Sequence, residues 1–130
     1  MIQLVVQKIY KTRTFFRWMR KTELTNETLR QAIQEMANGL IDADLGGHVL
    51  KKRVALPGRG KRGSTRTLVA TNRDDKWFFV FGFEKSERSN IAPDELIALQ
   101  LMALDLLKLS APQLNQLVVE GKIEDITDEN

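Results

Sequence analysis

The sequence predicts an α+β fold in which an N-terminal helical hairpin packs on a small central antiparallel sheet, with further helices at the C-terminus. Apolar residues recur at helical spacing between residues 12 and 40 and again after Pro93, whereas residues 49–83 hold three strand-like segments separated by turn formers. The length of 130 residues is that of one ordinary domain. We therefore expect a single domain over residues 1–130, of which residues from about 93 to 130 form a C-terminal helical extension.

The first predicted elements are a short strand and two helices. The apolar run Met1–Val6 suits a strand, and Thr12–Arg20 places several aromatic side chains on one face of a short helix. A second helix begins at Thr25, a residue type that caps helix N-termini, and stops near Gly39. The apolar positions that define this helix are Leu29, Ile33, Met36, Ala37 and Leu40. We expect the two helices, joined through residues 21–24, to form the hairpin.

The middle of the chain predicts an antiparallel meander. Its strands are Val49–Leu56, Thr65–Thr71 and Lys76–Phe83, separated by the turn-forming segments PGRGKRGS and NRDD. After the meander, Pro93–Leu109 predicts a helix whose first turn carries acidic residues, as the positive helix N-terminus favours. Residues 111–119 predict one more helix, and residues 121–126 a final strand.

Composition excludes several classes of protein. Cysteine is absent, which removes disulfides, thiolate nucleophiles and cysteine-ligated zinc. No window approaches 18 consecutive apolar residues, and the N-terminal apolar run is too short for a secretory signal. We expect a cytoplasmic protein that does not contact membranes.

Positive charge is concentrated in one segment. Residues 45–73 contain no Asp or Glu and carry eight basic residues, which are Lys51, Lys52, Arg53, Arg59, Lys61, Arg62, Arg66 and Arg73. The other residues have 12 basic and 17 acidic side chains, a net charge of −5. Such a block is typical of a polyanion partner, although a solvated basic loop is the alternative.

The loop at residues 57–63 and the strand after it carry the candidate site. The loop places three glycines among three cations but lacks the spacing of a nucleotide-binding P-loop, so contact with RNA phosphates is the favoured interpretation. On the next strand, Arg66 shares a face with Leu68 and Ala70, so it either lines a concave site or reaches to the sheet edge. Lys85 emerges where the third strand stops, and pairing with a neighbouring glutamate is its alternative role.

Two blocks of sequence carry a resemblance to a known family, DADLGGHVLKKRVALPGRGKRGSTRTLVA and WFFVFGFEKSERSNI. With the flanking segments from KTRTFFRW to LNQLVVEGKIEDI, they resemble the HigB-like branch of the RelE toxin superfamily. It implies a toxin that is a ribosome-dependent mRNA endonuclease, with a central antiparallel sheet, flanking helices, no metal and no other cofactor. It also implies two partners, namely mRNA on the ribosome and a cognate antitoxin, which we expect to be a helix-turn-helix protein.

The residue inventory limits how RNA could be cut. Attack by a 2′-hydroxyl needs a proton acceptor, a group that stabilises the phosphorane and a proton donor. The chain has one histidine, His48, so a paired-histidine mechanism within one subunit is impossible, and the carboxylates Asp42 and Asp44 lack obvious distant partners for a metal site. Cations remain, and we predict Arg66 for phosphorane stabilisation, with Lys85, Lys61 and Lys52 as candidates for proton transfer.

The remaining candidates are predicted to bind rather than react. The residues predicted to contact RNA or the ribosome are Lys51, Arg53, Arg59, Arg62 and Arg73. His48 is an accessory candidate, but a lone histidine in a turn is more often structural. Two other functions compete with the nuclease: a gyrase inhibitor resembling the ParE branch, and a nucleic-acid-binding module without catalysis. The cation-rich loop and Arg66 favour RNA over gyrase.

Overall fold

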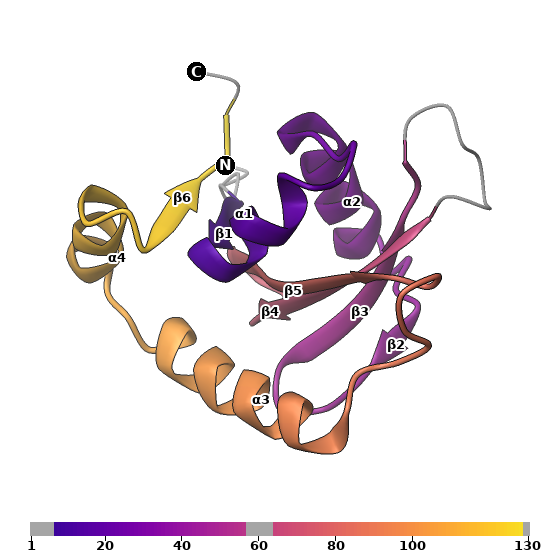
Figure 1. Cartoon of the computed structure of the whole chain (residues 1–130). Coiled ribbons are helices and arrows are strands. Elements are labelled where there is room, and N and C mark those ends of the chain that lie inside the picture. Colours follow the sequence, from indigo (N-terminus) through magenta and orange to yellow (C-terminus); the bar gives the residue numbers. More distant parts are fainter. Residues whose placement is uncertain (1–6, 57–63, 129–130) are drawn as a thin grey trace.

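The computed structural model describes residues 7–56 and 64–128 and is built around one six-stranded sheet of order β2-β3-β4-β5-β1-β6. Helices α1 and α2 cover one face of the sheet and α3 covers the other (Figure 1). In chain order the elements are β1 (Lys8–Thr12), α1 (Arg13–Met19), α2 (Asn26–Ala37), β2 (Ala43–Asp44), β3 (Val49–Val54), β4 (Thr65–Thr71), β5 (Lys76–Glu84), α3 (Pro93–Leu107), α4 (Ala111–Val119) and β6 (Ile123–Asp125).

The predicted fold class is wrong, because the sheet is mixed and a strand precedes the helices. Strand β1 runs parallel to β5, with Ile9 opposite Trp77 and Tyr10 opposite Phe78, and antiparallel to β6. The sequence KIYKT does not predict a strand, since two of its five residues are lysines. One of them, Lys11, is buried and donates a hydrogen bond to Asn26. The strand predicted over residues 1–6 lies outside the described residues.

Most of the individual elements are confirmed. Both N-terminal helices are present, and the hydroxyls of Thr12 and Thr25 cap them by accepting hydrogen bonds from the main chain. They do not stand as a hairpin ahead of the sheet but follow β1, with α1 contacting β5 and α2 contacting β3. The three central strands, both C-terminal helices and the final strand are also present. The two-residue strand β2 was not predicted.

Each face of the sheet carries its own hydrophobic core. The cluster beneath α1 and α2 includes Phe15, Leu29, Ile33, Trp77 and Phe79, whereas the cluster facing α3 and α4 includes Tyr10, Leu68, Phe78, Leu99 and Leu114. Successive strand residues point to opposite faces, so every central strand contributes to both clusters. Within the described residues, no helix is long and apolar enough to cross a lipid bilayer.

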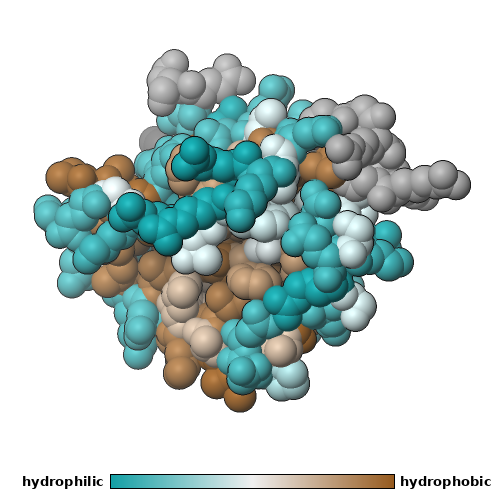
Figure 2. All heavy atoms as spheres, viewed as in Figure 1, coloured by the Kyte–Doolittle hydropathy of each residue, from teal (hydrophilic) through white to brown (hydrophobic). Residues whose placement is uncertain are grey.

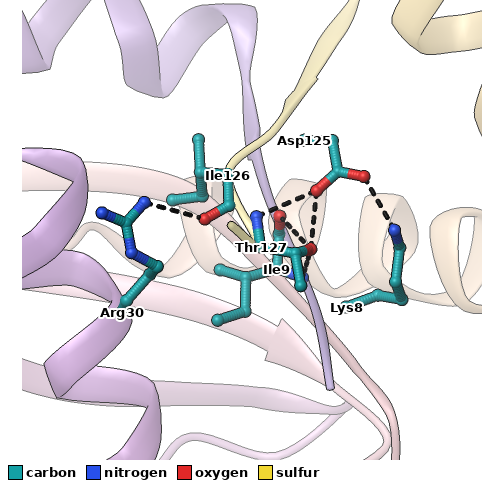
Figure 3. A network of polar contacts seen from close by, with 6 residues as sticks. All are labelled: Lys8, Ile9, Arg30, Asp125, Ile126 and Thr127. Carbon is teal, nitrogen blue, oxygen red and sulfur yellow. Dashed lines mark hydrogen bonds and ion pairs between the residues drawn. The ribbon is translucent and has the colours of Figure 1, made fainter. Parts of the chain in front are cut away.

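A network of polar contacts holds the C-terminal strand and the two residues after it to β1 and α2 (Figure 3). Lys8 Nζ lies 2.8 Å from Asp125 Oδ2, Arg30 Nη1 donates to the carbonyl of Ile126 at 3.1 Å, and Ile9 N donates to Thr127 Oγ1 at 3.0 Å. Partial burial alone would raise the pKa of Asp125, but the hydrogen bonds from Lys8 and Thr127 outweigh burial and lower it. Contacts between residues 96 to 118 positions apart thereby hold the C-terminal segment at the edge of the sheet.

Packing of α1 on β5 depends on the absence of a side chain at Gly82. A Cβ atom added there would lie 2.2 Å from Cζ3 of Trp18, well inside van der Waals contact. We expect Gly82→Ala to lower the free energy of unfolding by about 1–3 kcal/mol, measured by urea denaturation, because the indole ring is rigid. In a Trp18→Leu background the same change should cost much less. An equal cost in both backgrounds would contradict this account.

Candidate nucleic-acid interface

The basic residues of β3 alternate between the two faces of the sheet. Leu50 and Val54 belong to the core beneath α1 and α2, so Lys52, which lies between them, points to that face. Lys51 and Arg53 point to the opposite face, which α3 covers in part. A single-residue step along one strand therefore separates two adjacent lysines into different environments.

Pairing across three strands aligns these cations with the predicted arginine of β4. Arg53 lies directly opposite Arg66, and Arg66 lies directly opposite Phe83 of β5. The next row on the same face consists of Lys51, Leu68 and Phe81. Directly opposed residues have Cβ atoms about 4.5–5.5 Å apart, so the two arginine stems are neighbours.

Arg88 extends this group, and the sequence analysis missed it. Its guanidinium carbon lies 5.8 Å from the ring centroids of both Phe81 and Phe83. Two nitrogens of Arg88 contact the carboxylate of Glu95, one of them at 3.1 Å, and this hydrogen bonding lowers the pKa of Glu95. The sequence signal was an arginine five residues after the last aromatic residue of a buried strand. We use the name cationic face for Lys51, Arg53, Arg66 and Arg88 with Phe81 and Phe83.

The cationic face holds like charges close together. Arg66 Nη1 donates to Ser64 Oγ at 2.9 Å, a neutral partner, while Arg53 Nε lies 3.6 Å from Asp42 Oδ1. Like charges directly opposite one another on a sheet destabilise it. An anion with several oxygens, such as a phosphate diester, would accept hydrogen bonds from both guanidinium groups and remove that repulsion.

Lys52 has a different environment from the cationic face. Its Nζ lies 2.8 Å from Glu35 Oε1 and donates to the carbonyl of Leu40 at 3.0 Å, and its side chain is 9% exposed. The structure thus places this predicted proton-transfer residue against α2, on the far side of the sheet from Arg66.

His48 and Arg73 lie at the other end of β4 from Arg66. The main-chain amide of Thr71 donates to the carbonyl of His48, and Arg73 Nη2 lies 2.8 Å from Asp44 Oδ2. The strand between Arg66 and Thr71 spans about 17 Å, which is too far for shared contact with one phosphate. Both residues are exposed and have positive φ angles, 67° for His48 and 60° for Arg73, as expected in tight turns.

The other predicted site residues are only partly located. Lys85 is exposed and follows directly after the end of β5, two positions beyond Phe83. Arg59, Lys61 and Arg62 lie outside the described residues. The structure therefore brings together Lys51, Arg53 and Arg66, adds Arg88, and separates Lys52, His48 and Arg73 from them.

Comparison with known proteins finds one family. The model of the family described as RelE toxin of the RelE / RelB toxin-antitoxin system matches residues 7–126. A search of curated proteins finds no match.

The two neighbouring lysines of β3 should differ in their effect on stability. Lys52→Met removes a buried ammonium with two partners and leaves the carbonyl of Leu40 without this donor, so the free energy of unfolding should fall by about 1–2 kcal/mol. Lys51→Met, the matched control on the cationic face, should change it by less than about 0.5 kcal/mol. Urea denaturation of both variants measures the difference. Equal losses would show that the two side chains do not lie in these different environments.

Proposed function

The chain belongs to the RelE toxin family, so it is the toxin of a toxin–antitoxin pair and has an antitoxin as partner, and we propose that it cuts mRNA on the ribosome. The match covers most of the chain, which supports treating residues 1–130 as one toxin domain. The same proposal assigns it to the cytoplasm, where its substrate is translated, and gives the antitoxin a helix-turn-helix fold.

The observation that carries the proposal is the direct opposition of Arg53 and Arg66 on the cationic face. Two arginines on adjacent strands lie side by side there, near Lys51 and Arg88, and the carboxylates of Asp42 and Glu95 contact Arg53 and Arg88 but not Arg66. An anion with several oxygens can accept hydrogen bonds from both opposed arginines. The rings of Phe81 and Phe83 lie beneath the guanidinium group of Arg88, at the edge of the cationic face. Apolar rings next to the cations lower the local polarity, which strengthens electrostatic interactions with a bound phosphate.

The proposed reaction is a metal-independent transesterification. The 2′-oxygen attacks the adjacent phosphorus, a new P–O2′ bond forms, and the P–O5′ bond breaks. The proton lost from the 2′-hydroxyl goes to a base, and the departing 5′-oxygen gains a proton. We assign stabilisation of the phosphorane oxygens to Arg66, with Arg53 as its neighbour.

Binding and proton transfer are assigned to the remaining cations. Lys51 and Arg88 bind the backbone on either side of the reacting phosphate, and Lys85 and Lys61 are the proton-transfer candidates that this proposal keeps. A set of cations without a strong base is a weak catalyst by itself. We propose that the ribosome compensates by holding the mRNA with its 2′-oxygen oriented toward the adjacent phosphorus. Lys52, His48 and Arg73 are left out because of where the structure places them.

We expect Arg66→Ala to slow cleavage by roughly 10²-fold or more without unfolding the protein, as loss of an oxyanion-hole donor does. Arg66→Lys should recover little, since an ammonium cannot reproduce the planar fork. The control is Arg73→Ala, a strand-end arginine outside the cationic face, which should cut at the parent rate. Cleavage is measured by mapping message ends after induction and with purified programmed ribosomes.

Three outcomes would contradict the proposal. One is an Arg66→Ala variant that folds, binds ribosomes and cuts at the parent rate. Another is message ends that persist when ribosome entry is blocked. A third is growth arrest with intact messages and tangled chromosomes, which would indicate a gyrase inhibitor instead.

A further inference from the structure

A small cavity lies between α1 and the end of β5, at the border of the cationic face. It has a volume of about 240 Å³, and its lining consists of Thr14, Trp18, residues 81–83, Glu87 and Arg88. We call this cavity the aromatic slot. In Figure 2 hydrophobic surface lies at the centre of the view, where Figure 1 places β5 between α1 and α3. Pockets for drug-sized ligands measure about 300–1,000 Å³, so the aromatic slot suits a single flat ring system.

The aromatic side chains of the slot are held in fixed positions. The indole ring of Trp18 lies against Gly82, and its centroid is 5.4 Å from that of Phe15 in an edge-to-face contact. On the β5 side, the ring centroids of Phe81 and Phe83 are 6.3 Å apart. Aromatic side chains are stacking platforms for nucleobases, because every base has a π-face. The walls of the slot therefore fit a nucleobase.

Arg88 adds a second kind of stacking plane to the slot. Both of its η nitrogens donate to the carboxylate of Glu95, and its Nε donates to the carbonyl of Asn90 at 3.1 Å, so the orientation of the guanidinium plane is fixed. This plane already lies over the rings of Phe81 and Phe83. Nucleobases stack on guanidinium planes as they do on aromatic rings. Each η nitrogen keeps a second N–H, which can serve the RNA backbone.

The charges at the slot favour an uncharged ring over a second phosphate. Glu95 neutralises Arg88, and the exposed Glu87 lines the slot without a cationic partner in the described part of the chain. A carboxylate repels phosphate and accepts hydrogen bonds without donating any, so it selects a ring that presents N–H donors. Guanine presents a ring N–H and an amino group side by side, one for each carboxylate oxygen. Uracil has a single ring N–H between two carbonyl oxygens, which the same carboxylate repels.

We propose that the aromatic slot binds one nucleobase of the message, guanine by preference, next to the phosphate on the cationic face. The base stacks on Trp18 and on the guanidinium plane of Arg88, and Glu87 accepts hydrogen bonds from its ring N–H and amino group. This inference deepens the proposed nuclease function and rests on it for the identity of the ligand. Phe81 and Phe83 belong to both the slot and the cationic face, so a base in the slot orients the neighbouring phosphate.

Titration of guanosine monophosphate into the isotope-labelled full chain, followed by NMR, tests binding without cleavage. The chain has two tryptophans, so the indole N–H signals report on Trp18 in the slot and on Trp77, which is 1% exposed in the core. The Trp18 signal should shift to saturation while the Trp77 signal stays. Uridine monophosphate, which carries the same phosphate, should bind at least roughly fivefold more weakly. Ribose 5-phosphate, which has no base, should leave the Trp18 signal unchanged.

Two variants separate reading of the base from stacking. Glu87→Ala should bring the affinities for guanosine and uridine monophosphate within about twofold of each other, because the acceptor is lost. Its matched control is Glu27→Ala, an exposed glutamate in the first turn of α2, which should keep the parent's preference. Arg88→Lys keeps the charge and loses the plane, so both nucleotides should bind at least roughly fivefold more weakly. On programmed ribosomes, guanine should occupy one fixed position beside the parent's cuts, and Glu87→Ala should cut without that preference.

A Trp18 signal that does not move with guanosine monophosphate, or that moves equally with ribose 5-phosphate, would overturn the inference. So would a preference for guanine that survives in Glu87→Ala. If Arg88→Lys fails to fold by circular dichroism, the comparison of Glu87→Ala with Glu27→Ala decides, because both positions are exposed. A chain that binds guanine in the slot but does not cut mRNA would refute the nuclease alone. A chain that cuts mRNA and shows no shift of Trp18 would refute this inference alone.

Discussion

The register between β3, β4 and β5 is the constraint on which the proposed chemistry depends. It places Arg53, Arg66 and Phe83 in one row and Lys51, Leu68 and Phe81 in the next, on a single face. A slip of one residue in β3 would turn Lys51 and Arg53 into the core beneath α1 and α2 and expose Leu50 and Val54. Burial of these two apolar residues therefore also orients the cations.

The fold holds several like-charged side chains on one face of the sheet. Arg53 and Arg66 lie opposite each other on adjacent strands, Asp42 offsets part of their charge, and the two core clusters stabilise the sheet by packing on both of its faces. Arg88 is held by Glu95 from the start of α3, which links the cationic face to the helix that covers the same side of the sheet. At the far edge, β6 and the Lys8–Asp125 pair complete the sheet beside β1. The contacts that hold Arg88 and the edge of the sheet therefore come from helix α3 and strand β6, which follow the central strands in the sequence.

Local patterns predicted the parts of this structure that depend on local interactions. Aromatic residues at helical spacing located the first N-terminal helix, Thr25 located the start of the second, and alternation placed Arg66 on the face of Leu68 and Ala70. Alternation also predicts that Lys51 and Lys52 point to opposite faces of the sheet. The sequence does not show which of those faces α2 covers, so it could not tell which lysine is buried. Strand β1 was not predicted because it pairs with β5, a strand distant in sequence. Its residue Lys11 is also buried, which local sequence does not indicate, because the ammonium group donates a hydrogen bond to Asn26 of α2. Arg88 was missed because its partners, Phe81, Phe83 and Glu95, come together only in three dimensions.

The central claim is that the cationic face, and not the face beneath α2, meets the message on the ribosome. Lysine acetylation followed by mass spectrometry tests it most directly, using cleavage-deficient Arg66→Ala protein free and bound to programmed ribosomes. The account predicts that Lys51 becomes less reactive toward acetylation on binding. Lys21, which follows α1, and Lys122, which precedes β6, should keep their reactivity. Unchanged reactivity of Lys51 together with protection of Lys21 would place the ribosome on the opposite face and contradict the account.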